Sequence, residues 1–157
     1  MALEIERKFL LTDDSWKNFV IREVHIRDGL IATDNDRKVR VRISDMSATI
    51  AIKGRRVGTT RVEFEYTIPL SDAEEIIRTL PSERILEKRR HFVSYQGANW
   101  EIDVYEGILK GVVLAEIEMK TPNQKLSIPH WIGREVTSDP QYRKINMIAE
   151  RLLARSA

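Results

Sequence analysis

The chain of 157 residues contains no cysteine, which excludes disulfide bonds, thiolate metal sites and cysteine nucleophiles. It has no apolar run long enough to cross a membrane. Its charged N-terminal segment, MALEIERKFL, lacks the apolar core of a signal peptide. The 26 basic and 24 acidic residues nearly cancel, to a formal net charge of +2, which argues against a nucleic-acid-binding surface. We therefore expect a cytoplasmic protein without nucleic-acid or membrane partners.

Charged residues are abundant instead. They make up 32% of the chain, above the usual quarter for soluble domains, beside a hydrophobic share of 42% that is ordinary. The length suits one domain with a real core, and no repeat or linker divides the sequence. The sequence predicts a single domain over residues 1–157.

Alternation of apolar and charged residues predicts about eight β-strands. The clearer segments span residues 2–11, 38–43, 49–53, 61–68, 100–105 and 114–119, and weaker ones span 24–32 and 85–95. Two helices are expected, one opening at Ser71 as N-cap and ending near Leu80, and an amphipathic one over about 144–154. A short helix over 15–20 is a further prediction.

Side-chain parity sorts the charges on these strands. Successive side chains of a strand point to opposite faces, and in the first segment Glu4, Glu6 and Lys8 share a face opposite Ile5 and Phe9. The same separation recurs along the other strands. A solvated face of an antiparallel sandwich would explain one such strand. Faces that are almost purely ionic favour a sheet closed with its charges inward.

Closure of this kind would place seven acids and six bases in the interior. The acids are Glu4, Glu6, Glu63, Glu65, Asp103, Glu116 and Glu118, and the bases are Lys8, Arg40, Arg42, Lys53, Lys88 and Arg90. Burying these groups without ligands is costly. Carboxylates bind hard cations such as Mg²⁺ or Mn²⁺, and Arg and Lys bind phosphate oxygens. These side chains carry one net negative charge. Two divalent ions would make the interior positive, which suits binding of a polyanion.

The residues also carry a family resemblance. Glu4-Ile5-Glu6-Arg7-Lys8 resembles the ExExK signature of the CYTH superfamily, the triphosphate tunnel metalloenzymes. Further matching segments follow in the family's order: VRVR at 39–42, IK at 52–53, VEFE at 62–65, EKRR at 87–90, IDVY at 102–105 and AEIE at 115–118. The closing stretch over 129–144 is similar to that of the short bacterial members.

The resemblance implies an α+β, mainly β fold: an eight-stranded antiparallel barrel forming a tunnel, with flanking helices that include a C-terminal one. It implies that Lys8, Arg40, Arg42, Lys53, Lys88 and Arg90 bind the triphosphate. Glu4, Glu6, Glu63, Glu65, Asp103, Glu116 and Glu118 would bind Mg²⁺ or Mn²⁺, with two ions expected. Lys8, Glu4 and Glu6 would be catalytic.

The expected reaction is hydrolysis of inorganic triphosphate to diphosphate and phosphate. Alternatives left open are a nucleoside or thiamine triphosphatase, a class IV-type adenylate cyclase that makes cyclic AMP from ATP, and a non-enzymatic polyphosphate- or nucleotide-binding module. The sequence contains no P-loop, GxGxxG or GxSxG motif. Monomer and homodimer both remain open.

The sequence also predicts the positions of several residues outside this set. Arg61 has the inward parity but is expected at the surface, and Arg143 and Lys144 at a solvated helix start or a tunnel mouth. Trp131 is expected to be structural. His25, His91 and His130 lack the spacing of a zinc site and are expected to be ordinary. Neutralising Glu63 is expected to raise thermal stability by relieving like charges.

Overall fold

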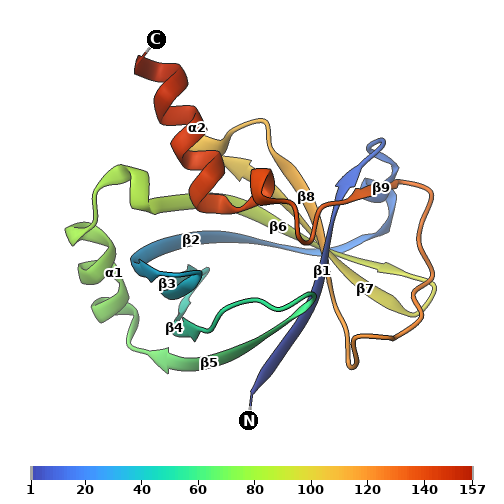
Figure 1. Cartoon of the computed structure of the whole chain (residues 1–157), viewed down its shortest axis with the longest axis horizontal. Coiled ribbons are helices and arrows are strands. Elements are labelled where there is room, and N and C mark those ends of the chain that lie inside the picture. The colour runs from blue at the N-terminus through green and yellow to red at the C-terminus, as the bar shows by residue number, and fades with distance from the viewer. Residues whose placement is uncertain (1, 157) are drawn as a thin grey trace.

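The computed structural model describes residues 2–156 and consists mainly of β-strands (Figure 1). The strands are β1 (Leu3–Leu11), β2 (Val20–Asp34), β3 (Arg37–Ser44), β4 (Ser47–Lys53), β5 (Thr60–Ile68), β6 (Ile85–Tyr95), β7 (Ala98–Glu106), β8 (Val113–Glu118) and β9 (Ile132–Glu135). The helices are α1 (Leu70–Thr79) and α2 (Lys144–Ser156), with a short 3-10 helix over Ser15–Phe19.

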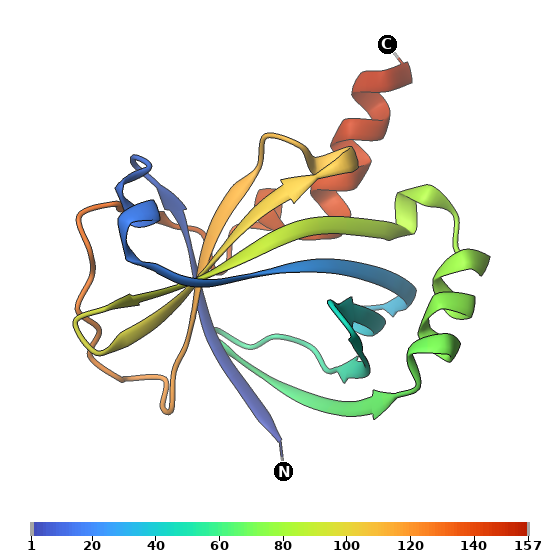
Figure 2. The same cartoon turned by 180° about the vertical axis from the view of Figure 1, so that it is seen from behind.

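The sheet closes on itself through its first strand. Its order is β5-β4-β3-β2-β6-β7-β8-β1-β9, every pairing is antiparallel, and β5 also pairs with β1, where Leu3 lies opposite Val62. Strands β1 to β8 therefore form a closed eight-stranded barrel, seen from both sides in Figures 1 and 2. This confirms the predicted fold. The short β9, which was not predicted, extends the sheet along β1 beyond the point where β5 ends.

Tight turns join the hairpins and fix their register. Asn35 and Asp36, between β2 and β3, both have positive φ angles of 47° and 68°. Two successive residues with positive φ match the twist of paired strands. Gln96 and Gly97 play the same part between β6 and β7, with φ angles of 46° and 77°.

Helix α1 covers the outer face of β3 and β4. Its buried residues Ala73 and Ile77 pack in a cluster with Val41 and Ile43. Gly29 of β2 permits this close approach, because a Cβ atom there would lie 2.8 Å from Leu80 Cδ1. The helix begins at Leu70 after Pro69, so the prediction that Ser71 is the N-cap is wrong; the proline's fixed φ already sets the entry into the helix.

A second core lies on the outer face of the sheet opposite the charged side. Trp16, Trp100 and Trp131 are almost fully buried there, and the rings of Trp100 and Trp131 meet edge to face with centroids 5.8 Å apart. The Ser15–Phe19 turn and the segment before β9 supply two of these rings. The structural role expected for Trp131 agrees with this burial.

The first turns of helix α2 pack against the barrel, and the rest of the helix projects away from it (Figure 1). Its buried residues Met147 and Ile148 join Leu86, Tyr105 and Leu114 in an apolar cluster. Leu86 and Tyr105 have the inward parity of the charged residues on their strands, so the inner face is apolar beneath α2 and ionic beyond it. Neither helix in the described part of the chain is long and apolar enough to cross a membrane.

Candidate active site

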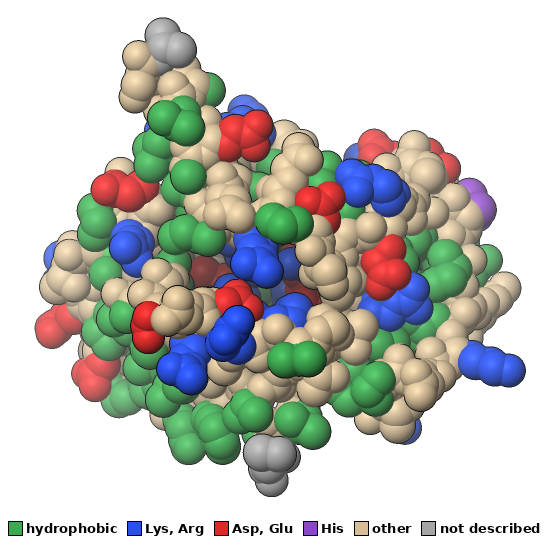
Figure 3. All heavy atoms as spheres, viewed as in Figure 1, with side chains coloured by type: hydrophobic (Ala, Val, Ile, Leu, Met, Phe, Trp, Pro, Cys, Tyr) green, Lys and Arg blue, Asp and Glu red, His purple; other side chains and the backbone are tan. Residues whose placement is uncertain are grey.

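A charged cavity of about 510 Å³ occupies the interior of the barrel. In Figure 3, acidic and basic side chains gather around the hollow at the centre of the visible face. Predicted site residues that line it are Glu4, Glu6, Lys8, Arg40, Arg42, Lys53, Glu63, Glu65, Arg90, Glu116 and Glu118. Inward convergence of the ionic faces is thereby observed.

Lys88 and Asp103 are placed differently from the rest of the predicted set. They are buried behind the cavity wall, with exposures of 1% and 0%, and the Lys88 Nζ donates to Asp103 Oδ2 at 2.6 Å. Asp103 also accepts two hydrogen bonds from Arg90, at 2.8 and 2.9 Å. Lys88 would therefore reach a ligand in the cavity only by rearranging its pair with Asp103.

Strand register decides which charges face one another. Lys8 of β1 lies opposite Glu116 of β8, and their Nζ and Oε1 atoms are 3.5 Å apart. Two residues earlier, Glu6 lies opposite Glu118. The first pair has opposite signs and the second has like signs, which is destabilising in a sheet unless a cation lies between them.

Arginines of β3 form one basic wall. The Arg42 Nε and Nη2 donate to the two oxygens of Asp28 at 2.7 and 2.8 Å. The Arg40 Nη2 donates to Glu65 at 3.2 Å. Burial alone would raise the pKa of Asp28, but Arg42 and Arg40 hold that pKa well below its usual range. The wall therefore consists of guanidinium groups whose orientation is set by hydrogen bonds to ionised carboxylates.

Lys53 bridges two carboxylates near the start of β1. Its Nζ lies 2.8 Å from Glu4 Oε1 and 2.9 Å from Glu63 Oε2. Burial raises the pKa of Glu63, but Lys53 and a hydrogen bond with Glu4 bring it below its ordinary value. The ionised Glu63 is therefore stabilised, which contradicts the expectation that its neutralisation would relieve strain.

The strained carboxylates lie elsewhere. Burial and the neighbouring Glu116 raise the pKa of Glu6, and burial followed by Glu4 and Glu6 raises the pKa of Glu118. Burial also raises the pKa of Glu101 to about 7, although its Oε2 lies 2.6 Å from Arg90 Nη1. Each of these groups would gain from an added cation.

Some buried polar atoms of the site have no hydrogen-bond partner. They are Glu4 Oε2, Arg40 Nε, Arg61 Nε and Glu116 Oε1. Unsatisfied buried donors and acceptors are costly and call for a specific reason. All four atoms lie within 4.0 Å of an opposite charge but form no hydrogen bond. Carboxylate oxygens in this state suit a hard cation and guanidinium nitrogens in this state suit an oxyanion, so the residues present fit both a divalent metal ion and a phosphate chain.

Sequence reasoning missed several residues of the cavity. Lys38, Arg61 and Glu101 each lie two residues from a predicted site residue on the same strand, so parity could have found them; Asp28 lies on β2, which carries no predicted site residue. The surface position expected for Arg61 is wrong: it is 5% exposed, with its Nη2 3.6 Å from Asp36. Arg61 lies opposite Glu4, where the start of β5 pairs with β1 and closes the barrel.

Further cations come from outside regular strands. Arg56, in the loop after β4, lies 3.4 Å from Glu6 and 3.6 Å from Glu4. Lys144, the first residue of α2, lines the cavity with Arg143. This agrees with the alternative that placed the two residues at the tunnel mouth. No periodic pattern marks a loop or a helix start, so the sequence offered no signal for Arg56.

Comparisons with known proteins agree with this geometry. A sequence model of the CYTH domain matches residues 2–150. The chain is 39% identical to an inorganic triphosphatase of Acetivibrio thermocellus over 148 residues, covering 94% of both proteins. It is 29% identical to an inorganic triphosphatase of Nitrosomonas europaea over 143 residues, covering 89% of this chain and 93% of that one.

The fold gives the same relationship. A crystal structure described as an inorganic triphosphatase superimposes with a TM-score of 0.64 at 28% identity, covering 92% of this chain and 97% of the other. The matched length, the closed barrel and the inward ionic set therefore lead to one assignment: this chain belongs to the CYTH family.

Proposed function

We propose that this protein hydrolyses inorganic triphosphate to diphosphate and phosphate, in a reaction that depends on a divalent metal ion. The observation that carries the proposal is that every predicted cation lining the cavity is already paired with a carboxylate. Arg42 with Asp28, Lys53 with Glu4 and Lys8 with Glu116 are examples. A ligand that brings phosphates for the bases and metal ions for the acids would replace these pairs without leaving a buried charge alone.

The basic residues are proposed to bind the phosphate chain. Arg40, Arg42, Lys8, Lys53 and Arg90 surround the cavity on β1, β3, β4 and β6. Charge on the phosphoryl oxygens shifts during phosphoryl transfer, and fixed cations stabilise it without reorganising. Lys88 stays a predicted phosphate ligand, while its pair with Asp103 supports the position of Arg90.

The carboxylates of β1 and β8 are proposed to hold the metal. Glu4, Glu6 and Glu118 supply hard oxygen donors, and Glu63 and Glu65 stand beside them on β5. In the described residues their oxygens do not yet converge, since Lys53 and Arg56 hold Glu4 and Glu6. A bound Mg²⁺ or Mn²⁺ would neutralise phosphate charge and lower the pKa of a bound water.

The proposed hydrolysis is an in-line displacement. A water oxygen forms a bond to the terminal phosphorus, the bond from that phosphorus to the bridging oxygen breaks, and the diphosphate leaves with the bridging oxygen. One proton of the water stays on the released phosphate and the other passes to solvent. Lys8, which lines the cavity beside Glu116, is proposed to stabilise the attacked phosphoryl group. Glu4 and Glu6, on the same face of β1, are proposed to complete this catalytic group.

The lining favours an inorganic chain over a nucleotide. Among the described lining residues, Tyr142 is the only aromatic one, so a purine has little to stack on. Inorganic triphosphate is also the substrate named for the two relatives. The adenylate cyclase reading needs a bound nucleoside, and the binding-module reading leaves the many carboxylates without a purpose.

A substrate panel tests the proposal. Phosphate release from inorganic triphosphate, ATP and thiamine triphosphate should be measured with Mg²⁺ and with Mn²⁺, beside an assay for cyclic AMP. We expect the fastest release from inorganic triphosphate. Cyclic AMP formation would instead support the cyclase, and tight binding without turnover would support a binding module. Oligomeric state, the single-domain organisation and cytoplasmic location remain predictions.

A further inference from the structure

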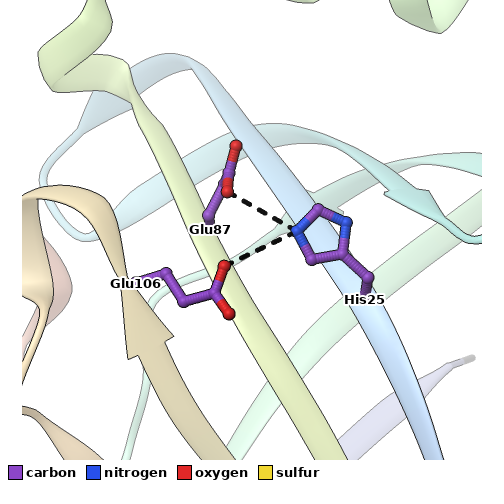
Figure 4. A group of neighbouring side chains, drawn as sticks. All are labelled: His25, Glu87 and Glu106. Carbon is purple, nitrogen blue, oxygen red and sulfur yellow. Dashed lines mark ion pairs between the residues drawn. The ribbon is translucent and has the colours of Figure 1, made fainter.

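Three metal-ligating side chains converge on the outer face of the barrel, away from the cavity. His25 of β2, Glu87 of β6 and Glu106 of β7 lie on adjacent strands, and Figure 4 shows their ends pointing toward one another. None of the three lines the cavity. Glu87 and Glu106 adjoin the inward-facing Lys88 and Tyr105 in sequence, so their side chains have the outward parity.

The spacing of the three groups suits a shared cation better than mutual hydrogen bonds. His25 Nε2 lies 3.5 Å from Glu87 Oε2 and 3.9 Å from Glu106 Oε2, and one ligand atom from each residue lies within 4.8 Å of the others. Hydrogen bonds of this kind are normally shorter than about 3.2 Å. Ligands of a tetrahedral zinc ion, at bonds of about 2.1 Å, lie about 3.4 Å apart.

The strand register adds a second, independent observation. Glu87 and Glu106 are directly opposite in the β6–β7 pair, where like charges destabilise a sheet unless a cation is shared. Arg27, which faces Glu87 across the β2–β6 pair, donates to Glu74 of α1 at 2.5 Å. The basic residue that faces Glu87 on β2 is therefore paired with a different carboxylate.

A supporting residue orients one of the ligands. The Arg89 Nε donates to Glu106 Oε1 at 2.9 Å, while its Nη1 donates to Glu23 at 3.0 Å. This leaves Glu106 Oε2 on the side of His25. With neutral His25, the group of Glu23, Glu87, Glu106 and Arg89 carries two net negative charges, which one divalent ion would balance.

We propose that His25, Glu87 and Glu106 form a zinc-class metal site on the outside of the barrel, separate from the triphosphate cavity. One imidazole and two carboxylates are donors that Zn²⁺ accepts in tetrahedral geometry, with water as the fourth ligand. Side-chain exposures of 38% to 42% leave the site open to solvent. The ion would crosslink three strands of the sheet and stabilise the folded state.

The site is tested with metal-free protein titrated with Zn²⁺ by calorimetry and with Co²⁺ by visible absorption, since tetrahedral Co²⁺ absorbs far more strongly than octahedral Co²⁺. We expect the wild type to give a tetrahedral Co²⁺ signal. His25→Ala should lower the affinity for Co²⁺ by at least roughly tenfold. Glu87→Gln should act likewise. His130→Ala is the matched control, because His130 is an exposed histidine bonded to Ser15.

Glu6→Gln separates this site from the cavity. The tetrahedral signal should persist in that variant, and Zn²⁺ should raise the Tm of the wild type but not that of His25→Ala. An unchanged signal in His25→Ala, or its loss in Glu6→Gln, would overturn the proposal. Should His25→Ala fail to fold by circular dichroism, His25→Gln serves for the same comparison. Triphosphate hydrolysis is expected to be unaffected by His25→Ala, so the outcome is independent of the proposed function.

Discussion

Asp28 holds Arg42 through two parallel hydrogen bonds inside the barrel, with Nε–Oδ1 and Nη2–Oδ2 distances of 2.7 and 2.8 Å. The fork is thereby fixed before any substrate arrives, and Arg40 Nε stands 4.0 Å from the same carboxylate. Asp28 is therefore a positioning residue for the basic wall.

Asp28→Asn tests that role. Losing one charged acceptor should misalign Arg42 and lower kcat/KM for triphosphate by roughly a hundredfold, and should lower the Tm because a buried charge loses its partner. Steady-state kinetics and thermal unfolding measure both effects. Asp34→Asn, an exposed position on the same strand, is the control, and equal kcat/KM in the two variants would contradict the role.

Lys8→Ala removes a cation that faces Glu116 across β1 and β8. Turnover of triphosphate should fall by about 10²–10³-fold, as for the loss of one group that stabilises developing charge. Far-ultraviolet circular dichroism should be unchanged. Lys17→Ala removes an exposed lysine outside the barrel and should leave turnover intact. Wild-type turnover in Lys8→Ala would remove this residue from the site.

Chelation tests the proposed metal dependence. EDTA should abolish phosphate release, because the carboxylates Glu4, Glu6 and Glu118 would then repel the polyanion without a bridging cation. Adding excess Mg²⁺ or Mn²⁺ should restore the activity. Phosphate release is measured before and after dialysis of the protein against EDTA. Full activity in the presence of the chelator would exclude the metal mechanism.

Glu118→Gln and Glu63→Gln should shift stability in opposite directions. Glu118 has a raised pKa from burial and its acidic neighbours, whereas Lys53 lowers that of Glu63. In metal-free buffer at pH 8, we expect the first change to raise the Tm by about 1–3 °C, which corresponds to relief of one like-charge contact. The second should lower it. Thermal unfolding of both variants in parallel decides the matter, and shifts of the same sign would refute this account.

Glu101 predicts a pH dependence of stability. Its pKa is raised to about 7 in the folded chain, above the ordinary value of 4.5, so the folded state binds the extra proton between these values. The free energy of unfolding therefore falls as pH rises from about 4.5 to 7 through this group. Glu101→Gln should flatten the decline in Tm between pH 5 and pH 8. Glu83→Gln, exposed outside the barrel, should keep it, and an unaltered slope in Glu101→Gln would contradict the assignment.

Parity in strands carried most of what the sequence could predict. Glu4, Glu6 and Lys8 on β1, and Arg40 and Arg42 on β3, all line the cavity as expected, because side chains two apart share a face. Every predicted strand segment is present, and Ile85–Tyr95 has the predicted bounds.

What the sequence could not predict depends on depth and on contacts between distant segments. Lys88 and Arg90 share a face, yet only Arg90 lines the cavity, because α2 and its apolar cluster close over the neighbouring part of the inner face. Arg56 reaches the site from a loop. The outer group of His25, Glu87 and Glu106 is assembled across three strands, so no spacing along the chain indicates it.

Strand β1 completes the barrel by pairing with three strands made much later: Leu3–Ile5 with β5, Glu6–Phe9 with β8, and Phe9 and Leu11 with β9. Within the sheet, β1 therefore precedes all three of its partners in the chain. Such non-local pairing is slow because the chain ends must meet before any contact is gained. We expect the alternating charges of β1 to disfavour its association with other chains before it pairs. Because β1 joins β5 to β8, the wall of the cavity is complete only when this early strand meets a strand near the other end of the sheet's sequence.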